Sequence, residues 1–302
     1  MDIFAYKKFE LPGAVEIVAG RGGLPLVKLS SKWSECEIYL HGAHVARFAH
    51  KTYGDILWLS PYSSFAVGAP IRGGIPLCFP WFGAHRSRKD LPLHGFARTR
   101  EWRLLSAAAL PGGKTQAVFS TRDDTETREV WPHEFELELR VTAGEDLEMA
   151  FSVKNTGKSP FEFEDAFHSY FKVRDPGACE VLGLEGLEYL DRSKGDRRAI
   201  QTGHARFEGE TIRAYMGAPS SCVLVDNSSG RRVRVEQRSI GATVIWNPGP
   251  TAAAVNREIL ETWDQFVCVE SANCLAKSLS AAPGELHTSE MRIAALPARE
   301  GA

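Results

Sequence analysis

Alternation of apolar and polar residues with a period of two is the feature that most constrains the fold of this chain. Residues 135–141, FELELRV, place large apolar side chains at every second position, and residues 147–153, LEMAFSV, repeat the pattern. The stretch between them, TAGED at 142–146, is typical of a turn. Because successive strand side chains point to opposite faces, these residues predict a β-hairpin with one buried and one solvated face.

The same period recurs in many short segments, whereas amphipathic helical patterns are scarce. Residues 161–171 continue the alternation, and only residues 255–262 suggest a helix, a short one. Other candidate strands are ECEIYL (35–40), DILWLS (55–60), RRVRVEQ (231–237), TVIW (243–246) and QFVCVE (265–270). Turn-rich clusters at 111–113, 226–230 and 247–250 separate such strands. The pattern predicts an all-β chain, folded as a large and mostly antiparallel sandwich.

No stretch has the composition of a linker, and no fixed-period repeat is visible. We therefore expect one domain over residues 1–302, with a loose tail at about 297–302. The net charge of −2, from 36 basic and 38 acidic residues, provides no global attraction for nucleic acid or an anionic membrane.

Neither a signal peptide nor a membrane span is expected. The N-terminal stretch MDIFAYKKFELPGAVEIV lacks the apolar core of a signal peptide, and no apolar run is long enough to cross a bilayer. The six cysteines show no CxxC spacing, and several lie in apolar strand-like runs, which favours buried reduced thiols over disulfides or a metal site. We expect a cytoplasmic monomer or weak oligomer that binds neither nucleic acid nor membrane.

A segment rich in glycine and proline, IRGGIPLCFPWFG at 71–83, interrupts the strand pattern. Both residue types are disfavoured in central strands, so the segment is predicted to be a shaped loop with an apolar body. Arg72 precedes Gly73 and Gly74, whose small size would let a ligand approach the backbone. Arg72 is either a ligand-binding guanidinium or the arginine of a packed turn, in a surface ion pair.

The segment LPLHGFAR at 91–98 places His94, Gly95 and Arg98 among apolar residues. A histidine followed by glycine suits a bend that faces a ligand. Arg98 and Arg72 together would make an anion site, because guanidinium groups match phosphate oxygens. A structural histidine and a solvated arginine are the alternative interpretation.

Two further segments carry candidate acid–base groups. In FEFEDAFHSYF (161–171), His168 is bounded by aromatic residues, and an imidazole there would titrate near neutral pH. In QFVCVESAN (265–273), an apolar run ends in Glu270. A carboxylate buried there would cost stability unless it has a partner or a functional role. Burial would raise the pKa of Glu270 toward the range of a general base. A structural histidine and a strand-end ion pair are the alternatives.

Several familiar site motifs are missing from the sequence. It contains no GxSxG, Walker loop, GxGxxG or CxxC pair. The histidines lack zinc-ligand spacing; His41 and His44 in HGAH come nearest, without a suitable carboxylate. We therefore predict no metal site and no cofactor.

Together these segments resemble the hexose-6-phosphate mutarotases, or glucose-6-phosphate 1-epimerases, of the galactose mutarotase-like superfamily. The resemblance runs from about residue 35 to residue 273. The matching segments, in order, are GAHV, IRGGIPLCFPWFG, LPLHGFAR, WPHEFELELRV, VKNTG, FHSYF, VIWNP and FVCVE. The FPWFG segment followed by HGFAR is the most specific of them.

The resemblance implies a β-supersandwich with an open sugar cleft, and metal-free interconversion of the α and β anomers of a hexose 6-phosphate. It makes His168 the acid that protonates the ring oxygen and Glu270 the base that takes the anomeric hydroxyl proton. It makes Arg72 and Arg98 phosphate ligands and His94 a sugar contact. Ring opening of a hemiacetal needs one acid and one base, which we expect on opposite sides of the ring.

At least two positions depart from the family pattern. Leu93 stands where some members carry a polar residue, often glutamine, and Ile212 stands where an aspartate that contacts the sugar is expected. Two alternatives therefore stay open. The chain is a mutarotase for a different or unphosphorylated aldose, or a non-catalytic carbohydrate-binding domain of the same fold.

Overall fold

The computed structural model describes residues 3–298. The tail expected at 297–302 falls largely outside these residues, and Pro297 and Ala298 have no regular structure. Within the described range no helix has the length and apolarity needed to span a bilayer.

The larger strands form three β-sheets, whose strand ladders are antiparallel throughout residues 3–298. The first sheet contains, in spatial order, β1 (Val15–Ala19), β2 (Pro25–Ser30), β3 (Ser34–Tyr39), β4 (His44–His50) and β5 (Gly54–Asp55). The second contains β17 (Ala205–Arg206), β14 (Cys179–Leu182), β19 (Ser221–Asp226), β20 (Arg231–Arg238), β24 (Leu286–Leu296), β10 (Leu147–Asn155), β9 (Phe135–Ala143), β8 (Lys114–Arg122) and β7 (Arg103–Leu110).

The third sheet carries the candidate site residues His168 and Glu270. It contains β16 (Arg197–Ile200), β15 (Glu188–Asp191), β18 (Thr211–Met216), β21 (Ala242–Asn247), β22 (Phe266–Asn273), β12 (Asp165–Phe167) and β6 (Leu77–Cys78), with β13 (Tyr170–Lys172) also paired to β22. A separate ribbon pairs β11 (Phe161–Phe163) with β23 (Leu279–Ala281).

Helical segments are short and lie in the connections. The α-helices are α1 (Thr125–Val130) and α2 (Gly249–Ala253). The 3₁₀ turns are η1 (Ile3–Phe9), η2 (Arg21–Gly23), η3 (Ala97–Thr99), η4 (Pro111–Gly113), η5 (Pro176–Ala178), η6 (Arg192–Lys194), η7 (Trp263–Gln265) and η8 (Leu275–Lys277).

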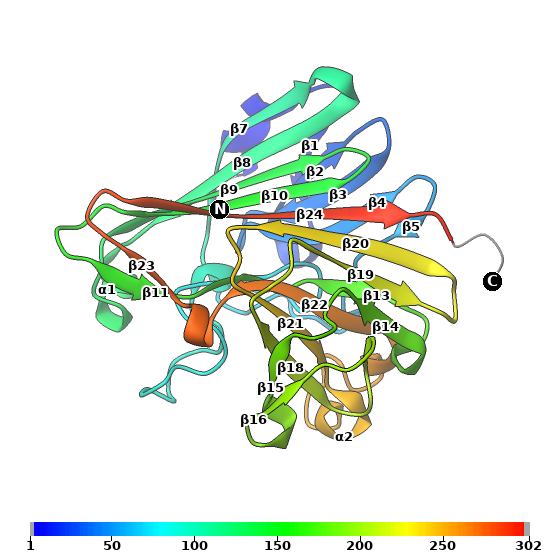
Figure 1. The fold of residues 1–302 in the computed structure, drawn as a ribbon. Helices are drawn as coiled ribbons and strands as arrows, with labels where there is room; N and C mark the ends of the chain where they lie inside the picture. The colour runs from blue at the N-terminus through cyan, green and yellow to red at the C-terminus, as the bar shows by residue number, and fades with distance from the viewer. Residues whose placement is uncertain (1–2, 299–302) are drawn as a thin grey trace.

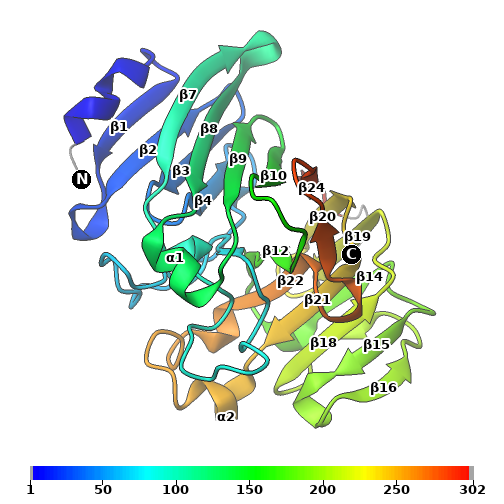
Figure 2. The same ribbon diagram turned by 90° about the vertical axis from the view of Figure 1, so that its left-hand side faces the viewer.

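The three sheets share one apolar core. In Figure 1 the nine-stranded sheet lies above the sheet of β15, β18, β21 and β22, and the sheet of β1–β5 lies behind its β7–β10 half; Figure 2 shows the same layers from the side. Phe48, Phe119, Phe135, Phe151 and Phe167, from five different strands, are all almost fully buried in this core. The inward-facing residues of β9 and β10 come from the alternation seen in the sequence.

The all-β prediction is confirmed, and so is the hairpin, whose strands β9 and β10 pair from Leu147–Ala143 to Asn155–Phe135. The helix expected at 255–262 is wrong: these residues form turns, and α2 ends before them. The DILWLS strand is also largely wrong, since only the two-residue β5 and isolated bridges occur there. The turn cluster at 247–250 instead starts α2, with Pro250 in its first turn.

Candidate active site

His168 lies where the strand expected over 161–171 is interrupted. That stretch forms three short strands, and His168 occupies the bend between β12 and β13. The His168 N–H donates to the Pro76 carbonyl at 3.1 Å instead of to a regular ladder. The side chain is 6% exposed, and its imidazole stacks on the Tyr170 ring, with centroids 4.9 Å apart and planes 9° from parallel. The bend thus fixes the ring on one side of the sheet.

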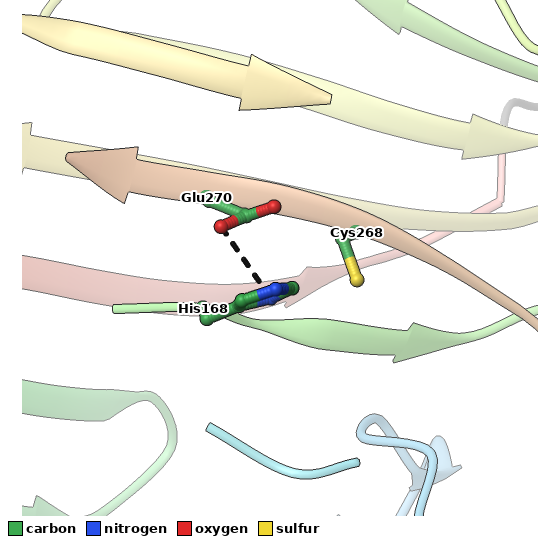
Figure 3. A group of neighbouring side chains, drawn as sticks. All are labelled: His168, Cys268 and Glu270. Carbon is green, nitrogen blue, oxygen red and sulfur yellow. Dashed lines mark ion pairs between the residues drawn. The ribbon is translucent and has the colours of Figure 1, made fainter. Parts of the chain in front are cut away.

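Glu270 approaches His168 from β22, the strand next to β12. Its side chain is 2% exposed. Figure 3 shows its carboxylate turned toward the imidazole, with Oε2 3.4 Å from His168 Nδ1. Neither of these two atoms has a hydrogen-bond partner, although both are enclosed. The structure therefore brings together the two groups predicted as acid and base, on one face of one sheet.

Burial favours the neutral forms of both groups. It raises the pKa of Glu270 well above its ordinary value, opposed by the positive charge of Arg98. Burial also lowers the pKa of His168 well below its ordinary value, helped by the charges of Arg98 and Arg72. A protonated Glu270 beside a neutral His168 holds as many protons as a carboxylate beside an imidazolium. The pair is therefore one proton acceptor and one proton donor in either form.

Arg98 is a buried cation without an anionic partner. It belongs to η3 and is 6% exposed. Its Nη2 donates to the Leu93 carbonyl at 2.8 Å, while its Nε has no partner. Among the described residues no carboxylate forms an ion pair with it, and burial and the charge of Arg72 lower its pKa. A buried guanidinium in this state is a ready ligand for an anion.

Arg72 is partly buried and already paired. Its Nε lies 3.2 Å from Glu258 Oε2, and its Nη1 donates to the Tyr170 hydroxyl at 3.2 Å. The ion pair foreseen as an alternative is thus present, although it lies beside the imidazole stack rather than on open surface. Gly73 does not leave room for a ligand, because a Cβ there would meet the Trp58 carbonyl oxygen at 2.6 Å. The glycine allows close packing of protein backbone instead.

His94 occupies the bend expected for the HG pair. Its φ is 63°, in the left-handed region, which a histidine adopts at a cost of about 1–3 kcal/mol. Gly95 follows with φ 71°, and a Cβ there would meet the Phe79 carbonyl oxygen at 1.9 Å. The Gly83 N–H donates to His94 Nδ1 at 3.2 Å, which leaves the proton of a neutral ring on Nε2. The His94 ring lies edge-on to His168, with centroids 5.1 Å apart.

The two departures from the family pattern have different structural outcomes. Leu93 points outward, with 55% of its surface exposed, and contributes through its carbonyl to Arg98. Ile212 lies on β18 opposite Trp246. An aspartate does occur nearby, as Asp191 on β15, but it is buried and accepts from the Ser193 hydroxyl at 2.6 Å. Neither position supplies a polar side chain for a sugar.

Sequence reasoning missed three residues at this site. Tyr170 stacks on His168, and Glu258 pairs with Arg72 from a loop that was expected to be helical. Cys268 shares a face of β22 with Glu270 because the two are two residues apart. The parity of FVCVE was a usable signal for Cys268, whereas no local pattern marks Glu258. A metal was not expected, yet His168, Cys268 and Glu270 place three possible donor atoms within 4.8 Å of one another.

Comparison with known proteins decides the family. The family model described as aldose 1-epimerase matches residues 25–294. The chain belongs to the aldose 1-epimerase family. A relative from Cenchrus ciliaris named "Putative glucose-6-phosphate 1-epimerase" is 33% identical, over 93% of this chain and 88% of its own. A relative of the same name from Escherichia coli is 32% identical, over 82% of this chain and 83% of its own.

Solved structures agree with this membership of the aldose 1-epimerase family. The crystal structure of a "putative mutarotase" from Salmonella typhimurium has a TM-score of 0.87 and 26% identity, and the match covers 96% of each chain. A galactose mutarotase-related enzyme from Lactobacillus acidophilus shares the fold at a TM-score of 0.73, with 16% identity over 91% of this chain and 98% of the other. The predicted resemblance, the all-β mutarotase fold and the epimerase class are therefore confirmed.

Proposed function

We propose that this epimerase interconverts the α and β anomers of a hexose 6-phosphate, with glucose 6-phosphate as the first substrate to test. The observation that carries the proposal is the buried pair of His168 Nδ1 and Glu270 Oε2, neither of which has a hydrogen-bond partner, close to the Arg98 guanidinium, which lacks an anionic partner. The names of the Cenchrus and Escherichia relatives agree with it. Six free and buried cysteines favour the cytoplasm as the place of action.

The proposed mechanism uses the pair as one base and one acid. In the reactive form of the pair, the proton of Glu270 has moved to His168. Glu270, then a carboxylate, removes the proton from the anomeric hydroxyl O1. His168, as an imidazolium, delivers a proton to the ring oxygen O5 while the C1–O5 bond breaks. The open-chain aldehyde rotates about C1–C2, and ring closure returns both protons with the roles reversed. Each positioned group contributes about 10²–10⁴-fold to the rate.

The spacing of the pair changes the expected geometry of this reaction. With His168 Nδ1 and Glu270 Oε2 only 3.4 Å apart, no sugar ring fits between them, so an acid and a base on opposite sides of the ring are not supported. O1 and O5 are bonded to the same carbon, and two adjacent catalytic groups can therefore serve both from one side. The sugar would lie over the pair.

The arginines hold the phosphate in this proposal. Arg98 supplies an unpaired guanidinium, and Arg72 would join it by exchanging its Glu258 carboxylate for a phosphate oxygen. Two cations near the pair also favour binding of the dianion over an uncharged sugar. Phosphate binding mainly fixes the position of the sugar carbon C1 over His168 and Glu270. His94 is a hydrogen-bond donor to the sugar through its Nε2.

Saturation-transfer NMR tests the substrate class. The protein should speed anomer exchange of glucose 6-phosphate at concentrations where it leaves glucose near the buffer rate. Replacing Arg98 by Met should raise the KM for the phosphorylated sugar by about tenfold or more, since a charge-assisted contact contributes about 1.5–3 kcal/mol. Equal exchange of both sugars, or an unchanged KM in the Arg98→Met and Arg72→Met variants, would favour an unphosphorylated aldose instead.

A further inference from the structure

His168, Cys268 and Glu270 place a nitrogen, a sulfur and an oxygen close to one another. Their donor atoms all lie within 4.8 Å of one another, and all three residues are buried. Cys268 and Glu270 project from the same face of β22, and Figure 3 shows His168 beside both. The acid–base reaction proposed above gives no role to the thiol.

The spacing of the pair is that of two metal ligands. His168 Nδ1 and Glu270 Oε2 lie 3.4 Å apart, beyond the usual range of a hydrogen bond, and neither has another partner. Two ligand atoms on one tetrahedral zinc ion, each about 2.0–2.2 Å from the metal, lie about 3.3–3.6 Å from each other. Both side chains are more than nine-tenths buried, so water satisfies neither atom fully.

We propose that His168, Cys268 and Glu270 form a binding site for a divalent transition-metal ion of the zinc class, whose occupancy blocks the acid–base pair. Imidazole, thiolate and carboxylate are ligands that zinc accepts together, whereas a thiolate disfavours magnesium and calcium. Three protein ligands leave the fourth tetrahedral position to water. A metal ion bound here therefore inhibits the enzyme. The ion itself has no part in the reaction.

The charge balance permits such binding despite two nearby arginines. Arg98 and Arg72 both act electrostatically on this region and oppose a bare dication. The ion binds with the Cys268 thiol and the Glu270 carboxyl deprotonated, and their protons pass to solvent. Two negative ligands then cancel the two positive charges of the metal. Relative to neutral Cys268 and Glu270 without metal, the net charge of the site is unchanged.

Cobalt tests the site without reference to catalysis. Reduced, chelator-treated protein is titrated with Co²⁺, which substitutes for zinc and gives a near-ultraviolet charge-transfer band when a thiolate binds it. The wild type should show this band, and Cys268→Ser should lose it. Cys222→Ser is the matched control, because Cys222 is another buried strand cysteine, on β19. Absence of the band in the wild type, or its persistence in Cys268→Ser, would overturn the site.

The inhibitory consequence rests on the proposed mutarotase activity and has its own measurement. Zn²⁺ should slow glucose 6-phosphate anomer exchange in the wild type. Relative to its own rate without zinc, Cys268→Ser should need about tenfold or more Zn²⁺ for the same fractional inhibition, the effect expected when one ligand is removed. If the wild type has no exchange activity, the cobalt titration still decides the site. Equal zinc inhibition of wild type and Cys268→Ser would contradict metal binding at the acid–base pair.

Discussion

At the scale of single residues, the candidate site is assembled from groups that cost stability. Glu270 is enclosed with one carboxylate oxygen unpartnered, and Arg98 is enclosed without a carboxylate. His94 adds the cost of a backbone conformation in the left-handed region. A chain selected for stability alone would avoid all three features, and their coincidence beside His168 is the mark of a site shaped for binding and proton transfer.

Glu270→Gln should raise stability while it removes activity. Burial raises the folded-state pKa of Glu270 above the ordinary value of 4.5, so the folded protein retains the proton longer than the unfolded chain does. The stabilising effect of this group is present below pH 4.5 and is lost as the pH rises toward the folded-state pKa. At neutral pH the variant should be more stable by on the order of 1–3 kcal/mol.

Denaturant unfolding of both proteins at several pH values measures this difference. The advantage of Glu270→Gln should grow from pH 4.5 upward. A variant that is less stable than the wild type at pH 7 would show that the carboxylate has a stabilising partner.

Glu258→Gln should strengthen binding of the sugar phosphate. The Glu258 carboxylate forms an ion pair with the Arg72 guanidinium, so a phosphate must compete with this carboxylate for Arg72. Neutralising Glu258 should lower the KM for glucose 6-phosphate up to about fivefold, the equivalent of ~1 kcal/mol for a partly exposed ion pair. Glu261→Gln is the control, since Glu261 lies in the same loop and accepts from the Tyr62 hydroxyl. A raised KM in Glu258→Gln would mean that Glu258 orients Arg72 for the phosphate.

At the scale of elements, a buried polar network sets the register of β12 against β22. Asn273 Nδ2 donates to Asp165 Oδ1 at 2.9 Å, and the Ser289 hydroxyl donates to Asp165 Oδ2 at 2.8 Å. In that register Asp165 faces Asn273, three residues from His168 and Glu270 respectively. A slip of one residue would turn these side chains to the other face of the sheet.

Asn273→Ala should therefore reduce both stability and kcat. It leaves the buried Asp165 carboxyl short of a donor, at a cost of about 2–3 kcal/mol. A shift of about 1 Å between His168 and Glu270 should lower kcat by about 10²-fold, with KM nearly constant because the arginines lie on other elements. Asn227→Ala, in an exposed turn, is the control. An unchanged kcat in a destabilised Asn273→Ala protein would restrict the network to a purely structural role.

The sequence predicts elements well where local pattern and tertiary environment agree. β9 and β10 follow from strict alternation, because each has one buried and one exposed face. The pattern over 161–171 is equally regular, yet a bond from His168 to the Pro76 carbonyl interrupts the strand. Residues 255–262 look helical alone, but Glu258 is held by Arg72 and by Ser60, 186 and 198 residues away along the chain. No local sequence pattern indicates contacts with partners so far away along the chain.

α1 was predictable from capping chemistry rather than from periodicity. Asp124 accepts from the Thr127 N–H, and the Thr127 hydroxyl accepts from the Asp124 N–H, a complete capping box. The helix has six residues and is too short for an apolar face to repeat. The site residues His168, Glu270, Arg72, Arg98 and His94 came from local motifs, whereas their convergence needed the fold.

At the scale of the whole molecule, one apolar core joins the three sheets without covalent links. All six cysteines are free and buried. Burial raises the pKa of Cys222 to about 12, which leaves almost no reactive thiolate at neutral pH. The native protein should therefore react with a thiol reagent far more slowly than the denatured chain, and a reductant should leave its Tm unchanged. A Tm that falls on reduction would reveal a disulfide in the purified protein.

The central claim is that His168 and Glu270 catalyse anomer exchange of a hexose 6-phosphate. Saturation-transfer NMR of glucose 6-phosphate, with a chelator present, measures that exchange directly. The wild type should exchange the anomers well above the buffer rate, and His168→Ala and Glu270→Gln should each lose about 10²–10⁴-fold while melting cooperatively. A wild-type rate equal to that of buffer, or full activity in either variant, would contradict the claim.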